Sequence, residues 1–413
     1  MKLFQRHILT SSVIAIVLTA CQTLPAQNAQ ETSGAQATQT SNATASTPKT
    51  AGPVSELINQ SEVIATVKSK AVAVDLERQA LEWGYTLKKR ERLEGLNVFL
   101  LTFDCPPGVK PKEAALELER LQPKSSVGAL QKYTMNSSNI QSVSPKAPKT
   151  FANEMLQWPE TACETPVKIG LIDGGVSKTF SEETTANLHQ ASFIDSPASE
   201  GAIMHGTSIA AILADPDRLK GVELYSAAVV DQDESGNEYS SPTAILKALN
   251  WMVLNDVKVV NISLSGPPNK VLETALDAAS EKGLITVAAV GNQGRNSAPQ
   301  FPAAYENVLA ATAVDVQGEI YDKAVRGSHV DFSAPGVDIY ISSAGQGKYI
   351  SGTSIAAPFV TAAIASSASL TDHKSRNDVI RYFANHATDL GPKGKDRTFG
   401  LGLINAKHIC KTG

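Results

Sequence analysis

The sequence predicts an α/β fold in which helices cover both faces of a parallel β-sheet, preceded by a small α+β (ferredoxin-like) domain. From about residue 167 onward, apolar segments of strand length alternate with segments of helix length, which is typical of a parallel sheet buried on both faces. Between residues 54 and 135, strand and helix patterns are mixed without this alternation. A chain of 413 residues with 42% hydrophobic side chains is also long enough for two or three domains.

The small domain is expected over residues 54–135, followed by a linker over residues 136–165. The helix over residues 112–121 is best supported, because Pro111 stands at its start and apolar side chains line one face. The other expected elements are a strand or helix start at 63–67, a helix at 74–83, strands at 85–90 and 96–103, and a last strand at 127–133. Residues 136–150 are rich in Ser, Pro and Lys, as expected for a linker.

The larger domain is expected over residues 166–413. Its expected strands are residues 167–172, 223–230, 257–262, 284–290 and 308–313, and its helices include residues 242–254 and 270–281. In a parallel sheet of this kind, active sites lie at the carboxyl ends of the strands.

The N-terminus has the pattern of an export signal over residues 1–20. A basic start precedes about 13 uncharged and mostly apolar residues, whereas a membrane-spanning helix needs about 20. The segment that ends at Cys21, Leu-Thr-Ala-Cys, resembles the bacterial lipobox and implies a lipid on Cys21; the alternative is a chance cysteine near an ordinary cleavage site. Gln22 stands where Asp often retains such lipoproteins at an inner membrane. The resemblance therefore implies an exported protein anchored to the cell envelope, on the periplasmic side of the outer membrane if the cell has one.

The segment after the signal, residues 21–53, is almost entirely Gln, Ala, Thr, Ser and Asn. This composition lacks the large apolar side chains that offset chain entropy, so it predicts a disordered tether. A lipid at one end of such a tether would leave the folded part mobile near a membrane surface.

Composition and cysteine spacing argue against nucleic-acid binding and against a structural metal site. Lys plus Arg number 37 against 41 Asp plus Glu, and the net charge of −4 is of the wrong sign for binding nucleic acid through phosphate contacts. The four cysteines lack the paired spacing of a zinc site, so no structural metal is expected.

Two candidate functional residues lie in the first half of the larger domain. Asp173 ends an apolar strand and is followed by Gly174 and Gly175, which places a carboxylate where the backbone must turn tightly. His205 is expected at the start of a buried helix, where a general base can face a cleft. Taken alone, Asp173 also fits a turn aspartate, and His205 a packed or capping histidine.

Two further candidates lie in the second half. Ser354 is in a turn that leads into an apolar helix expected to run to about residue 368, with Pro358 in its first turn. At such a helix start, the serine N–H and the helix dipole both favour an oxyanion. Asn292 follows the strand at 284–290, and its carboxamide can donate to a developing negative oxygen. Taken alone, Ser354 also fits an N-capping serine and Asn292 a turn asparagine.

The order of these residues along the chain favours a shared catalytic role over the separate structural roles. Asp173, His205 and Ser354 follow the order of the subtilisin triad, with Asn292 between the histidine and the serine. On these motifs the chain resembles the subtilisin-like serine proteases over about residues 167–406. The matching segments are residues 169–176, 205–211, 260–267, 288–294, 332–337, 352–358 and 400–406.

The resemblance implies a serine endopeptidase that needs no cofactor. Ser354 attacks the scissile carbonyl, His205 takes and returns the proton, and Asp173 orients the imidazole and stabilises its charged form. Asn292 and the Ser354 N–H form the oxyanion hole. The implied walls of the specificity pocket carry no charge, which predicts a broad preference for apolar residues before the cut. One wall is Ser263, Leu264, Ser265 and Gly266, and the other is Ala288, Ala289, Val290 and Gly291.

The small domain resembles the pro-domains of the same family, whose last strand leads toward the active-site cleft. It is therefore expected to act as an intramolecular inhibitor or chaperone, with polypeptides as the other partners. Residues 54–150 carry 14 basic and 11 acidic side chains, whereas residues 151–413 carry 20 and 29, giving net charges of +3 and −9. At surface screening this difference favours docking only weakly.

Some positions depart from the family pattern. Ile355 and Ala357 replace a Met and a Ser that are common after the nucleophile, and Ser265 replaces a frequent glycine. Residues 175–204 lack the acidic calcium-loop pattern of secreted relatives, so no firm calcium site is expected. The acidic run that begins at Asp231 is expected to be a solvated hairpin.

Two other functions are weighed against the protease. A pseudoenzyme would bind peptides or a partner without cutting them, and a structural envelope lipoprotein would leave the ordered triad as coincidence. Retention of all four chemical groups favours the enzyme.

The cysteines predict one disulfide. With Cys21 lipidated, three cysteines remain in an oxidising compartment. Cys163 and Cys410 flank the catalytic region, so we expect a bond between them and a free Cys105.

Overall fold

The structure is a computed structural model that describes residues 57–135, 139–140, 149–343, 346–367, 370 and 375–410. The expected export signal, Cys21 and the expected tether lie outside the described residues, as does most of residues 136–148. Within the described part of the chain, no helix is both long and apolar enough to cross a membrane.

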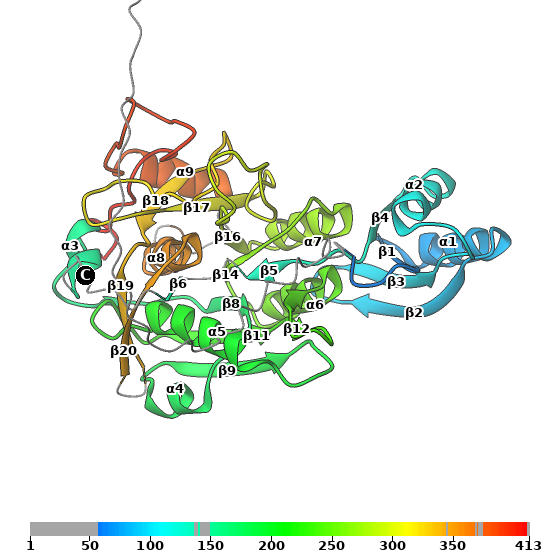
Figure 1. Cartoon of the computed structure of the whole chain (residues 1–413), viewed down its shortest axis with the longest axis horizontal. Helices are drawn as coiled ribbons and strands as arrows, with labels where there is room; N and C mark the ends of the chain where they lie inside the picture. Colours follow the sequence, from blue (N-terminus) through cyan, green and yellow to red (C-terminus); the bar gives the residue numbers. More distant parts are fainter. Residues whose placement is uncertain are drawn as a thin grey trace, which may run out of the picture. The chain divides into compact units, whose positions relative to one another are not determined.

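Residues 62–129 form a small α+β domain around a four-stranded antiparallel sheet, drawn in blue and cyan in Figure 1. Its elements are β1 (Glu62–Val67), α1 (Lys70–Glu82), β2 (Thr86–Leu93), β3 (Val98–Asp104), α2 (Pro111–Leu121) and β4 (Ser125–Ala129). The βαββαβ succession and the strand order β2-β3-β1-β4 are those of a ferredoxin-like domain, as the sequence predicts.

Neighbouring residues of β1 belong to two different cores, because successive side chains point to opposite faces of a strand. Val63 and Ala65 pack with apolar residues of α1 and α2. Ile64 belongs instead to a core that contains residues of α6 (Pro242–Leu254) and α7 (Lys270–Glu281) of the larger domain. The small sheet is therefore buried between its own helices and the larger domain.

The last strand of the small domain is shorter than expected. A single strand over residues 127–133 is wrong in its second half, since β4 ends at Ala129. Beyond it, Tyr133 exchanges backbone hydrogen bonds with Ser240 of the larger domain, and β5 (Thr134–Met135) pairs there as well. The backbone groups of this segment find their partners outside the small sheet, which explains why the strand ends early.

The larger domain is built on a seven-stranded sheet in which every neighbouring pair is parallel, in the order β18-β17-β16-β14-β8-β11-β9. The strands are β8 (Ile169–Asp173), β9 (Asn187–Ser192), β11 (Glu223–Ala228), β14 (Val259–Ile262), β16 (Ile285–Ala289), β17 (Val308–Val314) and β18 (Phe332–Pro335). The remaining helices are α3 (Phe151–Met155), α4 (Lys178–Glu183), α5 (Glu200–Leu213), α8 (Thr353–Ala365) and α9 (Arg376–Ala384). Short strands complete the domain: β6 (Asn139–Ile140), β7 (Cys163–Glu164), β10 (Leu219–Lys220), β12 (Val230–Gln232), β13 (Glu238–Ser240), β15 (Leu264–Ser265), β19 (Ile339–Ser343) and β20 (Gln346–Ser351).

Helices cover both faces of this sheet, as predicted. Leu171 of β8 belongs to a core with α5 and α8, whereas the next residue, Ile172, belongs to the core with α6 and α7. The expected strands and the helices α6 and α7 are confirmed. The sequence does not predict β9, because its residues, NLHQAS, contain no apolar run and it lies at the edge of the sheet.

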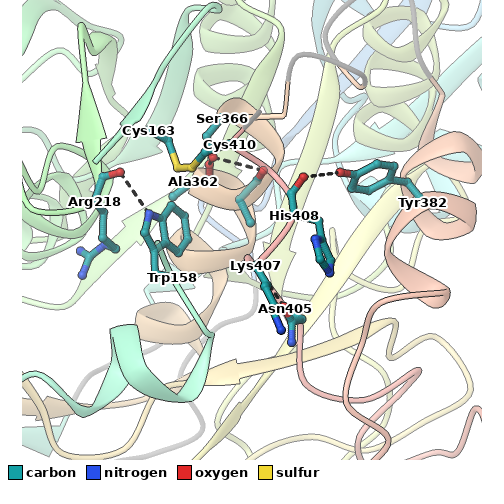
Figure 2. The surroundings of a disulfide bond; sticks show 11 residues. Trp158, Cys163, Arg218, Ala362, Ser366, Tyr382, Asn405, Lys407, His408 and Cys410 are labelled. Atoms are coloured by element: carbon teal, nitrogen blue, oxygen red, sulfur yellow. Dashed lines mark hydrogen bonds between the residues drawn. A yellow bond between two sulfur atoms is a disulfide. The ribbon is translucent and has the colours of Figure 1, made fainter. Parts of the chain in front are cut away.

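A disulfide joins β7 to the C-terminal segment. Cys163 of β7 is bonded to Cys410, with the Cα atoms 5.3 Å apart, while Cys105 is free and half-buried. Figure 2 shows hydrogen bonds in the segments around each of the two cysteines. The indole of Trp158 donates to the Arg218 carbonyl (3.1 Å). The Tyr382 hydroxyl donates to the carbonyl of His408 (3.3 Å), which connects the C-terminal segment to α9.

Removing this disulfide should lower the stability of the protein. We expect the Cys163→Ala/Cys410→Ala double variant to lose up to about 5 kcal/mol of unfolding free energy, because the bond spans 247 residues of chain. Urea unfolding followed by tryptophan fluorescence measures the loss. Cys105→Ala is the control and should change stability by less than about 1 kcal/mol. An unchanged midpoint in the double variant would show that the bond does not stabilise the fold.

Candidate active site

Asp173 is the last residue of β8, near the middle of the sheet, and it is completely buried. One carboxylate oxygen, Oδ1, accepts a hydrogen bond from the Gly174 N–H (2.7 Å) and lies 2.8 Å from Nδ1 of His205. The Asp173 carbonyl accepts from the Val229 N–H (2.8 Å), which fixes the end of β8 against the end of β11. The structure thus brings two of the predicted residues into direct contact.

His205 does not open its helix, so this part of the prediction is wrong. It is the sixth residue of α5, which begins earlier because the side chain of Ser199 accepts a hydrogen bond from Ala202 N–H and caps the helix. His205 is 6% exposed and still faces Asp173. With Nδ1 donating to the carboxylate, Nε2 becomes the ring nitrogen that can accept a proton.

The contact between Asp173 and His205 depends on glycines. A Cβ atom on Gly174 would lie 2.2 Å from the Ala202 carbonyl oxygen, and one on Gly206 would lie 2.1 Å from the Gly175 carbonyl oxygen. The turn after β8 therefore packs directly against the backbone of α5. A larger residue at either glycine would force the two segments apart.

Ser354 is the second residue of α8, which packs between α5 and the sheet. Pro358 lies inside this helix rather than in its first turn, and it has no N–H to donate to the Ser354 carbonyl four residues earlier. The Ser263 hydroxyl donates to that carbonyl instead (3.3 Å). Ser263 accepts in turn from Asn261 Nδ2 (3.0 Å), and Asn261 Oδ1 accepts from the Thr361 hydroxyl (3.3 Å).

Asn261 and Thr361 are positioning residues that the motif analysis misses. A signal was present, because Asn261 is the one polar residue in the buried strand β14, VVNI. A buried amide in an apolar strand needs partners, and here the partners lie on α8 and next to the serine.

Asn292 is oriented by the residue before Ser354. Its Oδ1 accepts hydrogen bonds from the Thr353 N–H (3.1 Å) and the Thr353 hydroxyl (2.9 Å), and the same hydroxyl accepts from the Gly291 N–H (3.2 Å). Because the amide oxygen is used on Thr353, the Nδ2 group is the part of Asn292 that can donate to an oxygen beside Ser354.

The residues expected as pocket walls follow two adjacent strands, since β14 and β16 pair with Ile262 opposite Ala288. All of them are buried: Ser263, Leu264, Ser265, Gly266, Ala288, Ala289, Val290 and Gly291. Gln293 Nε2 donates to the Ser265 hydroxyl (2.9 Å) and so connects the two segments.

The sequence profile of the Subtilase family matches residues 164–402, which is more than half of the chain. The chain belongs to the subtilase family. The subtilase is 32% identical to subtilisin DY of Bacillus licheniformis over 259 residues, which cover 59% of this chain and 91% of that protein. It is 30% identical to the minor extracellular protease Epr of Bacillus subtilis (strain 168) over 252 residues, or 58% of this chain. The match spans only 38% of the length of Epr.

Two solved structures share the fold of this subtilase. Fervidolysin from Fervidobacterium pennivorans, a keratinolytic enzyme related to subtilisin, gives a TM-score of 0.68 at 18% identity and covers 88% of this chain and 62% of that one. The epidermin leader peptide processing serine protease of Staphylococcus aureus gives a TM-score of 0.63 at 17% identity, covering 85% of this chain and 99% of that one. The fold is therefore subtilisin-like, and by family the protein is a subtilisin-like serine protease.

The close packing at Gly206 yields a test of how the site is aligned. We expect Gly206→Ala to lower kcat/KM by about 100-fold or more, because a shift of about 1 Å between α5 and the turn after β8 separates His205 from Asp173. Hydrolysis of a fluorogenic peptide, together with the thermal midpoint, measures the effect.

Gly201→Ala is the matched control on the same helix. A Cβ at Gly201 would meet only the end of the flexible Glu238 side chain, so near-normal activity is expected. If Gly206→Ala stayed within threefold of wild type, close backbone packing would not be what aligns the two residues.

Proposed function

We propose that the subtilase is an active serine endopeptidase that uses Asp173, His205 and Ser354 as its triad. The observation that carries the proposal is the 2.8 Å contact between the buried Asp173 carboxylate and His205 Nδ1 of α5, a helix that packs against α8, whose second residue is Ser354. Asp173 holds the imidazole in the tautomer that leaves Nε2 as the base. His205 then takes the proton of the Ser354 hydroxyl as it attacks the scissile carbonyl, and returns that proton to the leaving amine.

The proposed oxyanion hole consists of Asn292 and the Ser354 N–H. The Asn292 amide oxygen accepts from the N–H and the hydroxyl of Thr353, and this orientation makes its Nδ2 group the donor proposed for the tetrahedral intermediate. The Ser354 N–H belongs to the first turn of α8, where the helix dipole favours negative charge.

The proposed specificity is broad, with a preference for apolar residues before the cut. Its support is the lack of charged side chains along both proposed pocket walls, Ser263 to Gly266 and Ala288 to Gly291. An apolar pocket separates substrates by only about 1 to 3 kcal/mol per methylene group, so a narrow preference is not expected.

We propose that residues 54–135 are a pro-domain that inhibits the enzyme by occupying its cleft. β5 pairs in antiparallel register with β15, with Met135 opposite Leu264 and Thr134 opposite Ser265. Tyr133 exchanges two backbone hydrogen bonds with Ser240 on the other side. The segment thus joins two edges of the larger domain as a peptide substrate would.

The tyrosine of this segment is also held by its side chain. Its ring lies so close to Gly266 that a Cβ there would be 2.7 Å from a ring carbon. The Tyr133 hydroxyl donates to the Pro267 carbonyl (2.7 Å), and the side chain is completely buried.

We propose that maturation cuts the chain between Met135 and Asn139. β5 ends at Met135 beside β15, and β6 begins at Asn139, which pairs with Ser351 three residues before Ser354. The described residues on either side of the proposed cut therefore pair with segments close to Ser354, since Ser263, just before β15, donates to the Ser354 carbonyl. The proposed linker over residues 136–165 contains this cut.

Contacts between the two domains do not follow their net charges. The net charges of +3 and −9 would suggest that cations of the small domain contact anions of the larger one, but the ion pairs between the two domains have both polarities. They are Lys68–Glu281 (3.9 Å), Lys132–Asp233 (2.8 Å), Lys247–Glu91 (3.4 Å) and Lys270–Glu119 (2.9 Å). Local pairing, rather than the net charge, is what supports docking.

For the envelope, we propose that a lipid on Cys21 anchors the exported chain and that residues 21–53 are the tether between this lipid and the folded domains. The support is the lipobox-like sequence and the tether composition. Because this anchor precedes the pro-domain, a cut after Met135 would leave the lipid on the inhibitor and turn maturation into release of the enzyme.

Substitution of the proposed nucleophile and oxyanion donor tests the mechanism. We expect Ser354→Ala to lower turnover by about six orders of magnitude and Asn292→Ala by two to three, the sizes known from subtilisin. A fluorophosphonate probe should label wild type and not Ser354→Ala. Ser366→Ala, which removes another buried hydroxyl near the end of α8, is the control and should remain active. Peptidase activity in pure Ser354→Ala would refute the triad.

The release model is tested by fractionating cells. In wild type, we expect the pro-domain in the membrane fraction and part of the catalytic domain in the soluble fraction, since only the former keeps the lipid. Ser354→Ala should remain full-length and membrane-bound, and Cys21→Ala should free both domains. Immunoblots against each domain give the result. If active wild type contained only the full-length chain, release by processing would be wrong.

A further inference from the structure

We propose that the hairpin of β12 and β13 carries a subsite that selects Lys or Arg in the substrate, built from Asp233 and Tyr239. In residues 132–135, Lys132 occupies this subsite, and the next residue, Tyr133, packs on Gly266. The selected substrate residue is the one that takes the position of Lys132. This inference rests on the proposed function, because it treats residues 132–135 as a substrate-like strand in the cleft.

Lys132 is bound on this hairpin by two different groups. Its ammonium lies 2.8 Å from Oδ2 of Asp233 and 5.0 Å from the centre of the Tyr239 ring. The lysine side chain is 16% exposed and the aspartate side chain 25%, so the pair is largely shielded from water. A carboxylate and an aromatic face together are a binding site for a cation.

Lys132 directly precedes the segment, Tyr133 to Met135, that we propose to occupy the cleft. The next residue, Tyr133, is joined to Ser240 of β13 by backbone hydrogen bonds of 2.9 and 2.6 Å. Side chains alternate along such a strand, so Tyr133 packs on Gly266 while Lys132 reaches the hairpin. Any peptide bound in the same way would present its corresponding side chain to Asp233.

The hairpin holds Asp233 ready for a cation. Its Oδ1 accepts hydrogen bonds from the N–H groups of Ser235 (3.0 Å) and Asn237 (2.9 Å), while Oδ2 is the oxygen nearest Lys132. The pKa of the Asp233 carboxyl is lowered to about 2, with Lys132 as the largest cause and the Asn237 backbone N–H next. The carboxylate is therefore held in its ionised form while Lys132 occupies the site.

The charge of the hairpin also opposes acidic residues. Residues 231–238 contain four acidic and no basic side chains. A glutamate at the position of Lys132 would meet Asp233 as a like charge, whereas an arginine could both pair with the carboxylate and stack on Tyr239. The expected run that begins at Asp231 does form a hairpin, but Asp233 faces the cleft strand.

A set of three quenched fluorescent peptides tests the subsite. Each carries the sequence of residues 130–141, LQKYTMNSSNIQ, with Lys, Ala or Glu at the position of Lys132. The full chain is used as wild type, Asp233→Asn, Asp233→Lys and the control Glu234→Gln, which changes an exposed acidic residue of the same hairpin. Ratios of kcat/KM between peptides are compared within each variant, so they do not depend on the fraction of enzyme that is active.

For wild type and Glu234→Gln, we expect the Lys peptide to be cut about tenfold faster than the Ala peptide, and the Glu peptide to be the slowest. Asp233→Asn should reduce the Lys-to-Ala ratio to below about threefold, and Asp233→Lys should make the Glu peptide the best of the three. These results would establish the subsite.

Two outcomes would overturn the inference, and they differ. Equal ratios in wild type and Asp233→Asn, with all peptides cut and the fluorophosphonate probe bound, would refute the subsite while the protease function stands. Failure of every variant to cut any peptide or to bind the probe would refute the proposed function and the subsite with it.

Discussion

The site depends on one backbone contact that leaves no room for side chains. The turn after β8 lies against α5 at Gly174 and Gly206, and this packing places the Asp173 carboxylate 2.8 Å from His205. A carboxylate buried without a partner would be costly, so Gly174 N–H and the imidazole are also what makes its burial tolerable. Geometry and electrostatics at this point therefore depend on the same two glycines.

The first turn of α8, which contains Ser354, is held by hydrogen bonds to other segments of the chain. Pro358 has no N–H, so the Ser354 carbonyl receives no hydrogen bond from it within α8. The Ser263 hydroxyl donates to this carbonyl instead. Thr353, one residue before the serine, holds the amide oxygen of Asn292. The first turn of α8 is thus connected to the ends of β14 and β16, which is how three separate chain segments keep a fixed geometry around Ser354.

Residues 132–135 connect the small domain to the larger domain in two ways. Backbone pairing with Ser240 and β15 is independent of side chains and would suit many peptides. The side chains of Tyr133 and Lys132 add contacts with Gly266 and Asp233 that depend on residue type. If the small domain is the proposed pro-domain, the same contacts would hold it in place and would select substrates after it has left.

The sequence by itself determined the features that depend on nearby residues. Helices α6 and α7 have their expected bounds because their caps, Ser241 and Asn269, and their apolar faces are local. Asp173 ends a strand, Asn292 follows one and Ser354 lies in the first turn of a helix, and the order of these residues with His205 along the chain pointed to the four chemical groups.

Only the tertiary structure decided what depends on distant partners. The helix of His205 begins at a cap upstream of the motif, and the last strand of the small domain ends early because Tyr133 and β5 pair with the larger domain. The network from Asn261 to Thr361 and the contact of Lys132 with Asp233 each join residues about 100 positions apart. Hydrogen bonds and ion pairs act over a few ångströms of space, and only the folded chain sets which distant residues come that close.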